Sequence, residues 1–289
     1  MADGEDLDRV IYAVGLETSF KLSRTWDDLR HGGLRVDGLR HILQPFGNYH
    51  WVPRPDTRPD ELYQFDTIRA VTLGGGDTLS LTRYSPLEFP AFNTIDAIDK
   101  LHVVRFGLRQ KLQTRRDGQP WDLVELEGWT DWRVETAGDE DEFSDLYANL
   151  RLLPFSWLAF DGFGRYDMDD GLVRECNAAM RIVHGDRWSL GAGTRWLRDD
   201  SNLVSFSATV RLGRRWVAQT YHRVDLEDGE WESQEYVLRQ EAHDWLFTYG
   251  VRYDGERLQE DELFAFFAVT LKAAPQLGLS VGRVGLGGY

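Results

Sequence analysis

Residues 9–26 have the sequence RVIYAVGLETSFKLSRTW, in which apolar side chains alternate with small or charged ones. The apolar set is Val10, Tyr12, Val14, Leu16, Phe20 and Leu22, and the opposite set is Ala13, Gly15, Glu17, Ser19, Lys21 and Ser23. Successive side chains of a β-strand point to opposite faces, so this period of two predicts a strand with one apolar face. The stretch is far longer than the usual strand of about 5–6 residues. Long alternating strands in series are typical of a transmembrane β-barrel.

The same alternation continues along the chain and predicts an all-β, antiparallel fold. Four Asp-Gly pairs, which tolerate the positive φ of tight hairpin turns, separate alternating runs: Asp117-Gly118, Asp170-Gly171, Asp228-Gly229 and Asp254-Gly255. A single helical turn around Ile95, Ile98 and Leu101 is the main alternative to strand or loop. About thirteen strands result, at roughly 8–25, 36–52, 101–115, 121–136, 143–154, 157–167, 171–184, 187–198, 202–213, 215–227, 232–242, 244–254 and 262–273.

The connections between these strands alternate in length. Those at 155–156, 185–186, about 214 and about 243 are short, and those at 53–100, 137–142, 199–201 and 255–261 are mostly longer. Outer-membrane barrels place short turns in the periplasm and long loops outside, so residues 53–100 are predicted to form a long extracellular loop. The first strand would then begin outside and the last would end in the periplasm. Complete single-chain barrels of this type have an even strand number, so about thirteen predicts that strands are missing before Met1 and that residues 1–289 are one partial barrel domain.

The hairpin around Gly118 predicts a face of paired charges. Symmetric closure places Lys111 opposite Glu125, Arg109 opposite Glu127 and Arg105 opposite Asp131, each pair contributing about 0.2–1 kcal/mol. A charged lipid-facing residue costs about 2–4 kcal/mol at mid-bilayer, so these side chains are expected to face a hydrated lumen. The alternative is the solvated face of a soluble sheet. The predicted lumen-lining set is Arg105, Arg109, Lys111, Glu125, Glu127, Asp131 and Arg133.

Composition narrows the function classes. A hydrophobic content of 42% is too high for a disordered chain, and no apolar run reaches the roughly 20 residues of a membrane helix. A net charge of −15 argues against nucleic-acid binding. Cys176 is the single cysteine, so no disulfide within the chain is expected. The amino-terminal residues Met-Ala-Asp-Gly-Glu-Asp do not form a signal peptide.

Motifs for metal, cofactor or catalytic chemistry are not recognised. The seven histidines, at 31, 41, 50, 102, 184, 222 and 243, show no metal-ligand spacing, so neither a metal nor a cofactor is predicted. Gly74-Gly75-Gly76 lacks the Lys-Ser/Thr of a phosphate loop, and no Gly-x-Ser-x-Gly elbow is present. A Ser-His pair formed across strands stays open. Two acidic runs, Asp139–Glu142 and Asp167–Asp170, are predicted in outer loops, where they either hold divalent cations or are solvated turn charges.

One motif is Leu39-Arg40-His41-Ile42-Leu43-Gln44-Pro45 followed by Tyr49. It resembles the Arg-His-aliphatic-aliphatic-Glu-Pro strand of the LPS-assembly outer-membrane protein family, LptD, with Gln44 in place of the acid. The resemblance is to the carboxyl-terminal barrel domain of that family, and it implies that this chain is the carboxyl-terminal half of a larger barrel. Residues 92–99, Phe-Asn-Thr-Ile-Asp-Ala-Ile-Asp, resemble the family's Phe-Asp-x-Ile-Asp loop, with Asn93 in place of Asp. Residues 104–108, 188–191 and 264–273 fit its later strands, and the likeness runs from about residue 8 to 280.

The resemblance implies a non-enzymatic translocon component that inserts lipopolysaccharide (LPS) into the outer leaflet of a Gram-negative outer membrane. The family's barrel of about 26 strands encloses a plug lipoprotein and releases LPS through a seam between its first and last strands. The partners implied are LPS, the plug lipoprotein and the barrel-assembly machinery. Arg40, His41 and Pro45 are expected to shape a strand, with a possible bulge at Pro45. The expected seam strand contains Leu263, Phe264, Phe266, Phe267, Val269 and Leu271, although Phe264 and Phe266 break its alternation.

Two alternatives stay open at this stage. One is a small self-closing outer-membrane barrel that acts as a passive pore or a lipid-modifying enzyme. The other is a soluble β-sandwich, which would remain monodisperse without detergent. A partial barrel exposes sheet edges and an apolar belt and is expected to aggregate in plain buffer.

Overall fold

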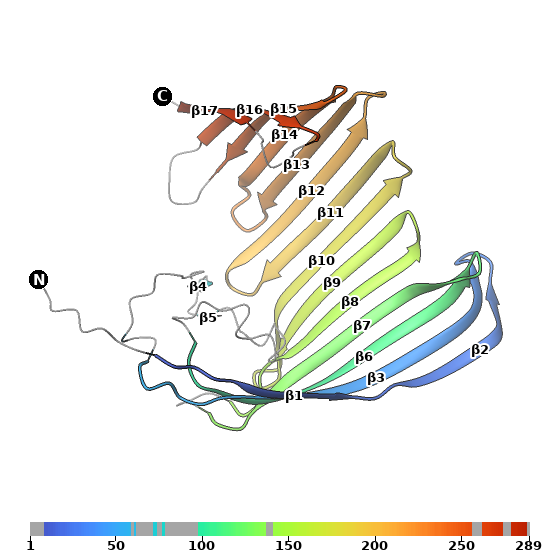
Figure 1. Ribbon diagram of the computed structural model, residues 1–289, viewed down its shortest axis with the longest axis vertical. Helices are drawn as coiled ribbons and strands as arrows, with labels where there is room; N and C mark the ends of the chain where they lie inside the picture. The colour runs from blue at the N-terminus through green and yellow to red at the C-terminus, as the bar shows by residue number, and fades with distance from the viewer. Residues whose placement is uncertain are drawn as a thin grey trace, which may run out of the picture. The chain divides into compact units, whose positions relative to one another are not determined.

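The structure is a computed structural model that describes residues 9–58, 61, 72–73, 77–78, 98–136, 141–255, 262–273 and 279–287. Its regular elements in these ranges are β-strands, as the alternation predicts (Figure 1). No helix in this part of the chain has the length and hydrophobicity needed to span a membrane. The strands are β1 (Val14–Ser19), β2 (Leu22–His31), β3 (Val36–Val52), β4 (Thr72–Leu73), β5 (Asp77–Thr78), β6 (Leu101–Arg116), β7 (Gln119–Arg133), β8 (Leu146–Phe155), β9 (Leu158–Asp167), β10 (Leu172–His184), β11 (Trp188–Leu197), β12 (Ser201–Arg211), β13 (Trp216–Asp225), β14 (Trp231–Glu241), β15 (Trp245–Asp254), β16 (Glu262–Leu271) and β17 (Leu279–Gly287).

Neighbours in sequence are neighbours in one large sheet. Its hydrogen-bonding order is β1-β3-β6-β7-β8-β9-β10-β11-β12-β13-β14-β15-β16-β17, with β2 beside β3, while β4 and β5 form a separate pair. The described pairings are antiparallel, for example β3 with β6 and β12 with β13. This is a barrel-like, all-β meander, although β1 and β17, the ends of the order, are not hydrogen-bonded to each other.

Pro45 explains why the strand predicted at residues 8–25 is divided into β1 and β2. Both β1 and β2 pair with β3, and Phe20 lies between them beside Pro45. The Phe20 amide donates to the Pro45 carbonyl at 3.4 Å, but proline has no N–H to return a bond. The predicted bulge at Pro45 is wrong, because the register of β3 against β6 passes through it unshifted. The irregularity lies instead between Trp26 and Arg30.

The strand expected to be last is not at the edge of the sheet. Leu263 to Leu271 belong to β16, which pairs with β15 on one side and with β17 on the other. The expected edge position of the seam strand, and the expectation that the last strand ends on the side of the short connections, are therefore wrong. β17 was not predicted because its Gly-rich sequence, Leu-Ser-Val-Gly-Arg-Val-Gly-Leu-Gly, shows little alternation of apolar and polar side chains.

Turn chemistry is confirmed at three of the four Asp-Gly pairs. Asp117 and Gly118 both have positive φ, 51° and 78°, which closes the β6–β7 hairpin with two residues. Gly171 and Gly229 also have positive φ. The φ of Gly255 is not positive. Glycine is required there because a Cβ would lie 2.6 Å from the Trp231 carbonyl oxygen.

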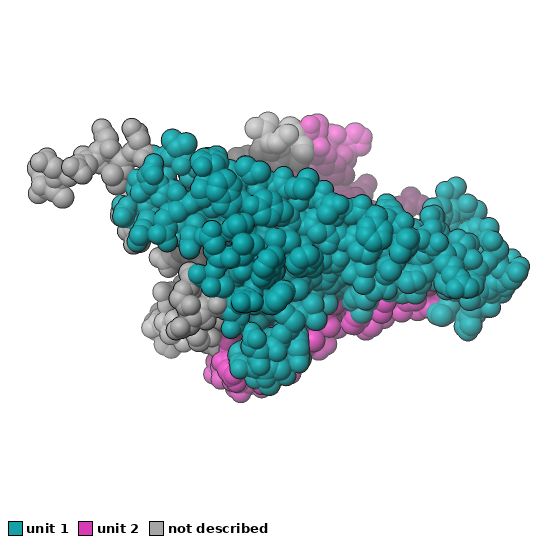
Figure 2. All heavy atoms as spheres, turned by 90° about the horizontal axis from the view of Figure 1, so that it is seen from below, with its two compact units in different colours: residues 1–150, 163–174 teal, residues 151–162, 175–289 magenta. Residues whose placement is uncertain are grey.

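The chain divides into two compact units (Figure 2). Unit 1 comprises residues 1–150 and 163–174, and unit 2 comprises residues 151–162 and 175–289. Unit 1 contains the longest strands, β3, β6 and β7, of 17, 16 and 15 residues. Unit 2 contains shorter ones, such as β11, β13 and β15 with ten residues each.

Some predictions fall outside the described residues. These are Gly74-Gly75-Gly76, the first six residues of the 92–99 motif, and most of the 53–100 loop, in which β4 pairs with β5. Of the proposed helical turn, Leu101 is described as the first residue of β6.

Candidate functional site: a polar sheet face with paired charges

The β6–β7 hairpin has the predicted register. Arg105 lies opposite Asp131, Arg109 opposite Glu127 and Lys111 opposite Glu125. A shift follows Leu112, so that Gln113 pairs with Asp122. We call the side of the sheet that carries these charges the polar face and the opposite side the apolar face.

Arg105 and Asp131 form a buried pair. Arg105 Nε donates to Asp131 Oδ1 at 2.7 Å and Nη2 donates to Oδ2 at 3.0 Å, so both carboxylate oxygens are engaged. The two side chains are 5% and 7% exposed. Ser144 adds to the arrangement, because the Asp131 amide donates to its hydroxyl at 2.9 Å. This end of the face is packed rather than open to water.

The other pairs along the hairpin are partly exposed. Arg109 Nε donates to Glu127 Oε1 at 2.7 Å, with side chains 37% and 35% exposed. Lys111 Nζ lies 2.5 Å from Glu125 and 3.4 Å from Asp122. Arg109 also lies 3.6 Å from Glu17, which sits on β1. The charges therefore compensate one another along the part of the face that water reaches.

Arg133 lies on the polar face and donates to backbone carbonyls. Its Nη1 donates to the carbonyl oxygens of Asp141 at 2.7 Å and Phe143 at 3.1 Å. It thus holds the segment that leads into β8, and its charge is not paired with a ladder carboxylate in the bonds described.

An aromatic cluster on the polar face lies beside these charges and was not predicted. Phe46, Trp129 and Tyr147 are buried together, and Phe163 packs against them. The rings of Trp129 and Tyr147 stack with centroids 5.6 Å apart. Phe46 covers its cross-strand partner Gly107, where a Cβ would lie 2.1 Å from the ring. The Arg109 guanidinium lies 4.1 Å from the Phe46 ring centroid.

The motif residues of β3 divide between the two faces. Arg40 lies opposite Gln113 and His41 opposite Leu112, so Arg40 shares the polar face and His41 the apolar face. His41 Nε2 lies 3.3 Å from Gln110 Oε1. The motif therefore shapes a strand rather than gathering its polar side chains at one point.

Unit 2 repeats the two-faced pattern. In β12, Ser205, Ser207 and Thr209 share the polar face, and Phe206 and Val210 share the apolar face, where they are 51% and 40% exposed. In β16, Leu263, Phe267, Val269 and Leu271 lie on the apolar face. Phe264 and Phe266 lie on the polar face, as their positions in the sequence require.

Phe266 has a structural reason to break the alternation. It lies directly opposite Gly250, and a Cβ at Gly250 would lie 2.1 Å from its ring. An aromatic ring covering a cross-strand glycine is a known means of stabilising glycine in a sheet. The pairing of a glycine with an aromatic residue was visible in the sequence only once the register was known.

Aromatic side chains mark both ends of β11 and β15 on the apolar face of unit 2. Trp188 and Trp196 lie near the two ends of β11, and Trp245 and Tyr253 near the two ends of β15. Trp216 begins β13 and stacks on Tyr249 at 6.5 Å. Two aromatic rows that bound an apolar band are the arrangement seen at membrane interfaces.

The two acidic runs meet within unit 1. The carboxylate of Asp141 raises the pKa of the Asp169 carboxyl above its ordinary value. Arg174 Nη2 forms ion pairs with Asp167 Oδ2 at 2.7 Å and with Asp170 Oδ2 at 2.6 Å. These ion pairs were not predicted from the sequence. Among the described residues no group of three or more His, Cys, Asp or Glu is arranged to hold a metal ion.

No protein-family profile matches the chain, and no curated protein matches it.

Proposed function

We propose that this chain forms part of an outer-membrane β-barrel that carries LPS to the outer leaflet, without catalysing a reaction. The observation that carries the proposal is the two-faced sheet: an apolar face with aromatic side chains at both ends of β11 and β15, and a polar face with cross-strand charge pairs. Ten-residue strands such as β11 and β15 match the roughly 9–11 residues that a tilted strand needs to cross a bilayer.

The polar face suits passage of a charged, sugar-rich headgroup. Arg109 and Lys111 are 37% and 44% exposed, and each is already paired with a carboxylate. Compensated charges keep the face hydrated but leave little net attraction for an anionic phosphate, so a headgroup would pass without being trapped. In this proposal the plug lipoprotein would occupy the space beside the polar face, and the barrel-assembly machinery would insert the chain.

The motif resemblance to LptD supplies the identity of the cargo. It rests on residues 39–49, 92–108 and the later strands. The proposed cargo therefore depends on those motifs, and the proposed barrel architecture depends on the sheet.

Photo-crosslinking in cells tests the cargo. A photoreactive phenylalanine at Glu127, on the polar face, should give an LPS adduct that disappears when LPS export from the inner membrane is stopped. The same residue at Leu126, on the apolar face, is the matched control and should contact outer-leaflet LPS whether or not export continues. The absence of an adduct at position 127, or one that does not depend on export, would contradict transport.

A second candidate, a lipid-modifying enzyme, is favoured by two contacts of His102 in unit 1. Tyr49 Oη lies 3.2 Å from His102 Nε2, and His102 Nδ1 lies 3.4 Å from Glu135 Oε1. This hydroxyl–imidazole–carboxylate order is that of an activated nucleophile. Release of fatty acid from phospholipid vesicles by the purified chain, abolished by Tyr49→Phe, would favour this candidate over transport.

A further inference from the structure

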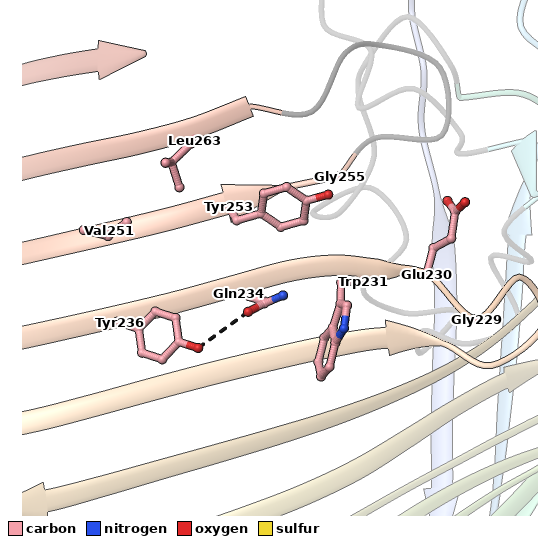
Figure 3. Close-up of a pocket in the computed structure, with 9 residues that line it drawn as sticks. All are labelled: Gly229, Glu230, Trp231, Gln234, Tyr236, Val251, Tyr253, Gly255 and Leu263. Atoms are coloured by element: carbon pink, nitrogen blue, oxygen red, sulfur yellow. Dashed lines mark hydrogen bonds between the residues drawn. The ribbon is translucent and has the colours of Figure 1, made fainter. Parts of the chain in front are cut away.

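Two adjoining grooves lie on the apolar face of unit 2. The first, the Trp231 groove, has a volume of about 620 Å³ and is lined by Glu230, Trp231, Gln234, Tyr236, Tyr253 and Leu263, among others (Figure 3). The second, the Leu238 groove, has a volume of about 570 Å³ and is lined by Ala208, Ala218, His222, Leu238 and Tyr249, among others. Tyr236 and Val251 line both grooves, so the two meet along these side chains.

The grooves differ in position along the strands. Trp231 is the first residue of β14, and Tyr253 is next to the last residue of β15, so the Trp231 groove lies at the end of these strands, beside Gly229, Glu230 and Gly255. Leu238 and its partner Tyr249 lie deeper along the same strands. In a bilayer the first groove would be at the interface and the second within the hydrocarbon.

The Trp231 groove brings polar groups together on a face that is mainly apolar. Gln234 lies directly opposite Tyr253, and Tyr236 Oη donates to Gln234 Oε1 at 3.5 Å. Trp231 and Tyr236 lie on either side of Gln234 (Figure 3). Polar groups that face lipid are costly unless they have hydrogen-bonding partners, so an amide held between rings at the interface indicates a polar ligand.

A further polar pair extends this region. Thr220 and His222 line the Leu238 groove, and their side chains are in contact, Oγ1 to Nε2, at 2.6 Å. The His222 ring lies 5.2 Å from that of Tyr236 and 5.9 Å from that of Trp231, centroid to centroid. The hydroxyl, imidazole and amide groups thus gather around Tyr236, between the interface and the apolar groove.

The charge of the grooves selects the type of headgroup. Neither a lysine nor an arginine is among the described residues that line them, and Glu230 brings a negative charge to the rim of the Trp231 groove. Among these described lining residues a phosphate would meet the repulsion of the Glu230 carboxylate. Sugar hydroxyls, in contrast, would find acceptors and a donor in Glu230 and Gln234, and the ring faces of Trp231 and Tyr253 suit the C–H face of a sugar.

We propose that the two grooves together bind one lipid with a sugar headgroup, the sugar in the Trp231 groove and an acyl chain in the Leu238 groove. The proposal rests on the membrane location in the proposed function, but not on transport. Small residues make room for the chain, since Ala208 and Ala218 lie between larger side chains. Gly255 shapes the rim, because its amide donates to the Glu232 carbonyl at 3.0 Å and a Cβ would press on Trp231.

The test uses the full chain in phosphatidylcholine vesicles that contain a small, equal share of glucosyl-diacylglycerol, diacylglycerol or phosphatidylglycerol. Native mass spectrometry of the extracted protein measures which lipid is retained. The glucosyl lipid should be retained about tenfold more than either of the others. Gln234→Leu and Trp231→Ala should remove this preference.

Trp157→Ala is the matched control, because Trp157 is 47% exposed and Trp231 is 46% exposed. It should leave the preference intact. Gln234→Leu places an apolar side chain on an apolar face, so this variant is expected to fold. Loss of the preference in it would then reflect loss of binding. Equal retention of the lipids, a preference for phosphatidylglycerol, or a preference that survives both groove substitutions would overturn the proposal.

Flotation of the same vesicles separates this proposal from the proposed function. A chain that does not float with lipid contradicts both the membrane location and the groove. A chain that floats but shows no preference for the glucosyl lipid contradicts the groove alone.

Discussion

At the scale of single residues, the same ion-pair chemistry has different consequences at different depths on the polar face. The Arg105–Asp131 pair is almost fully buried, and losing one partner of such a pair costs about 3–5 kcal/mol because the other charge stays buried. The Arg109–Glu127 pair is about one-third exposed and is screened by solvent. The residues predicted to line the lumen therefore have two roles. Arg105 is packed within the protein, and Arg109 keeps the polar face hydrated.

Exchange of charges across one pair tests the register directly. Arg109→Glu or Glu127→Arg alone places like charges opposite each other and should lower the free energy of unfolding by about 1 kcal/mol. The double exchange should recover most of that loss, but not all, because Glu17 would then lie near a glutamate. Urea unfolding in detergent micelles measures the three variants. A double variant no more stable than the singles would mean that the pair is not formed.

The raised pKa of Asp169 predicts a pH effect in the connection 168–171. Since Asp141 disfavours the charged form of Asp169 in the folded chain, the repulsion is present above the raised pKa. It is relieved as the pH falls through that pKa, so local stability should increase on mild acidification, down to the ordinary value of 3.8. Hydrogen exchange of the amides in 141–145 should slow as the pH is lowered, after correction for intrinsic rates. Asp169→Asn should abolish this change, and persistence of the change in that variant would contradict its source.

At the scale of elements, glycine and phenylalanine act as cross-strand partners in both units. Phe46 covers Gly107, and Phe266 covers Gly250. Gly250→Ala should therefore force the Phe266 ring aside and cost about 1–3 kcal/mol. Adding Phe266→Ala removes the clash, so the double variant should be more stable than the sum of its singles predicts. Gly164→Ala, with no atom near its would-be Cβ, is the matched control for thermal unfolding. Strictly additive effects would show that the two residues do not touch.

The sequence was sufficient to predict elements whose signals are local. Alternation located β3 and the strands from β6 to β16, and the Asp117-Gly118 turn determined the register of β6 and β7. The sequence was insufficient to predict contacts that depend on a residue of another strand. The covering of Gly250 by Phe266 and the contact of Arg174 with Asp167 and Asp170 depend on pairing that alternation does not specify. The bulge predicted at Pro45 was wrong for a related reason. The missing N–H of proline interrupts the neighbouring strand, between β1 and β2, and leaves the register of β3 intact.

At the scale of the whole molecule, the aromatic rows and the alternation of β12 predict how the chain meets a bilayer. Residues on the apolar face should contact lipid, and residues on the polar face should contact water. Cys176 is exposed and is first replaced by serine, so that a single new cysteine can be placed at each position from 205 to 209.

A polarity-sensitive fluorophore on these cysteines should report a period of two in vesicles. Positions Phe206 and Ala208 should give blue-shifted emission that is quenched by brominated acyl chains, and positions Ser205, Ser207 and Thr209 should be quenched by aqueous iodide instead. In a soluble β-sandwich the apolar positions would be buried in protein, so neither brominated acyl chains nor iodide would quench their emission. Because the period depends on sheet geometry and not on cargo, this outcome decides between a membrane barrel and a soluble sheet, whichever lipid the polar face carries.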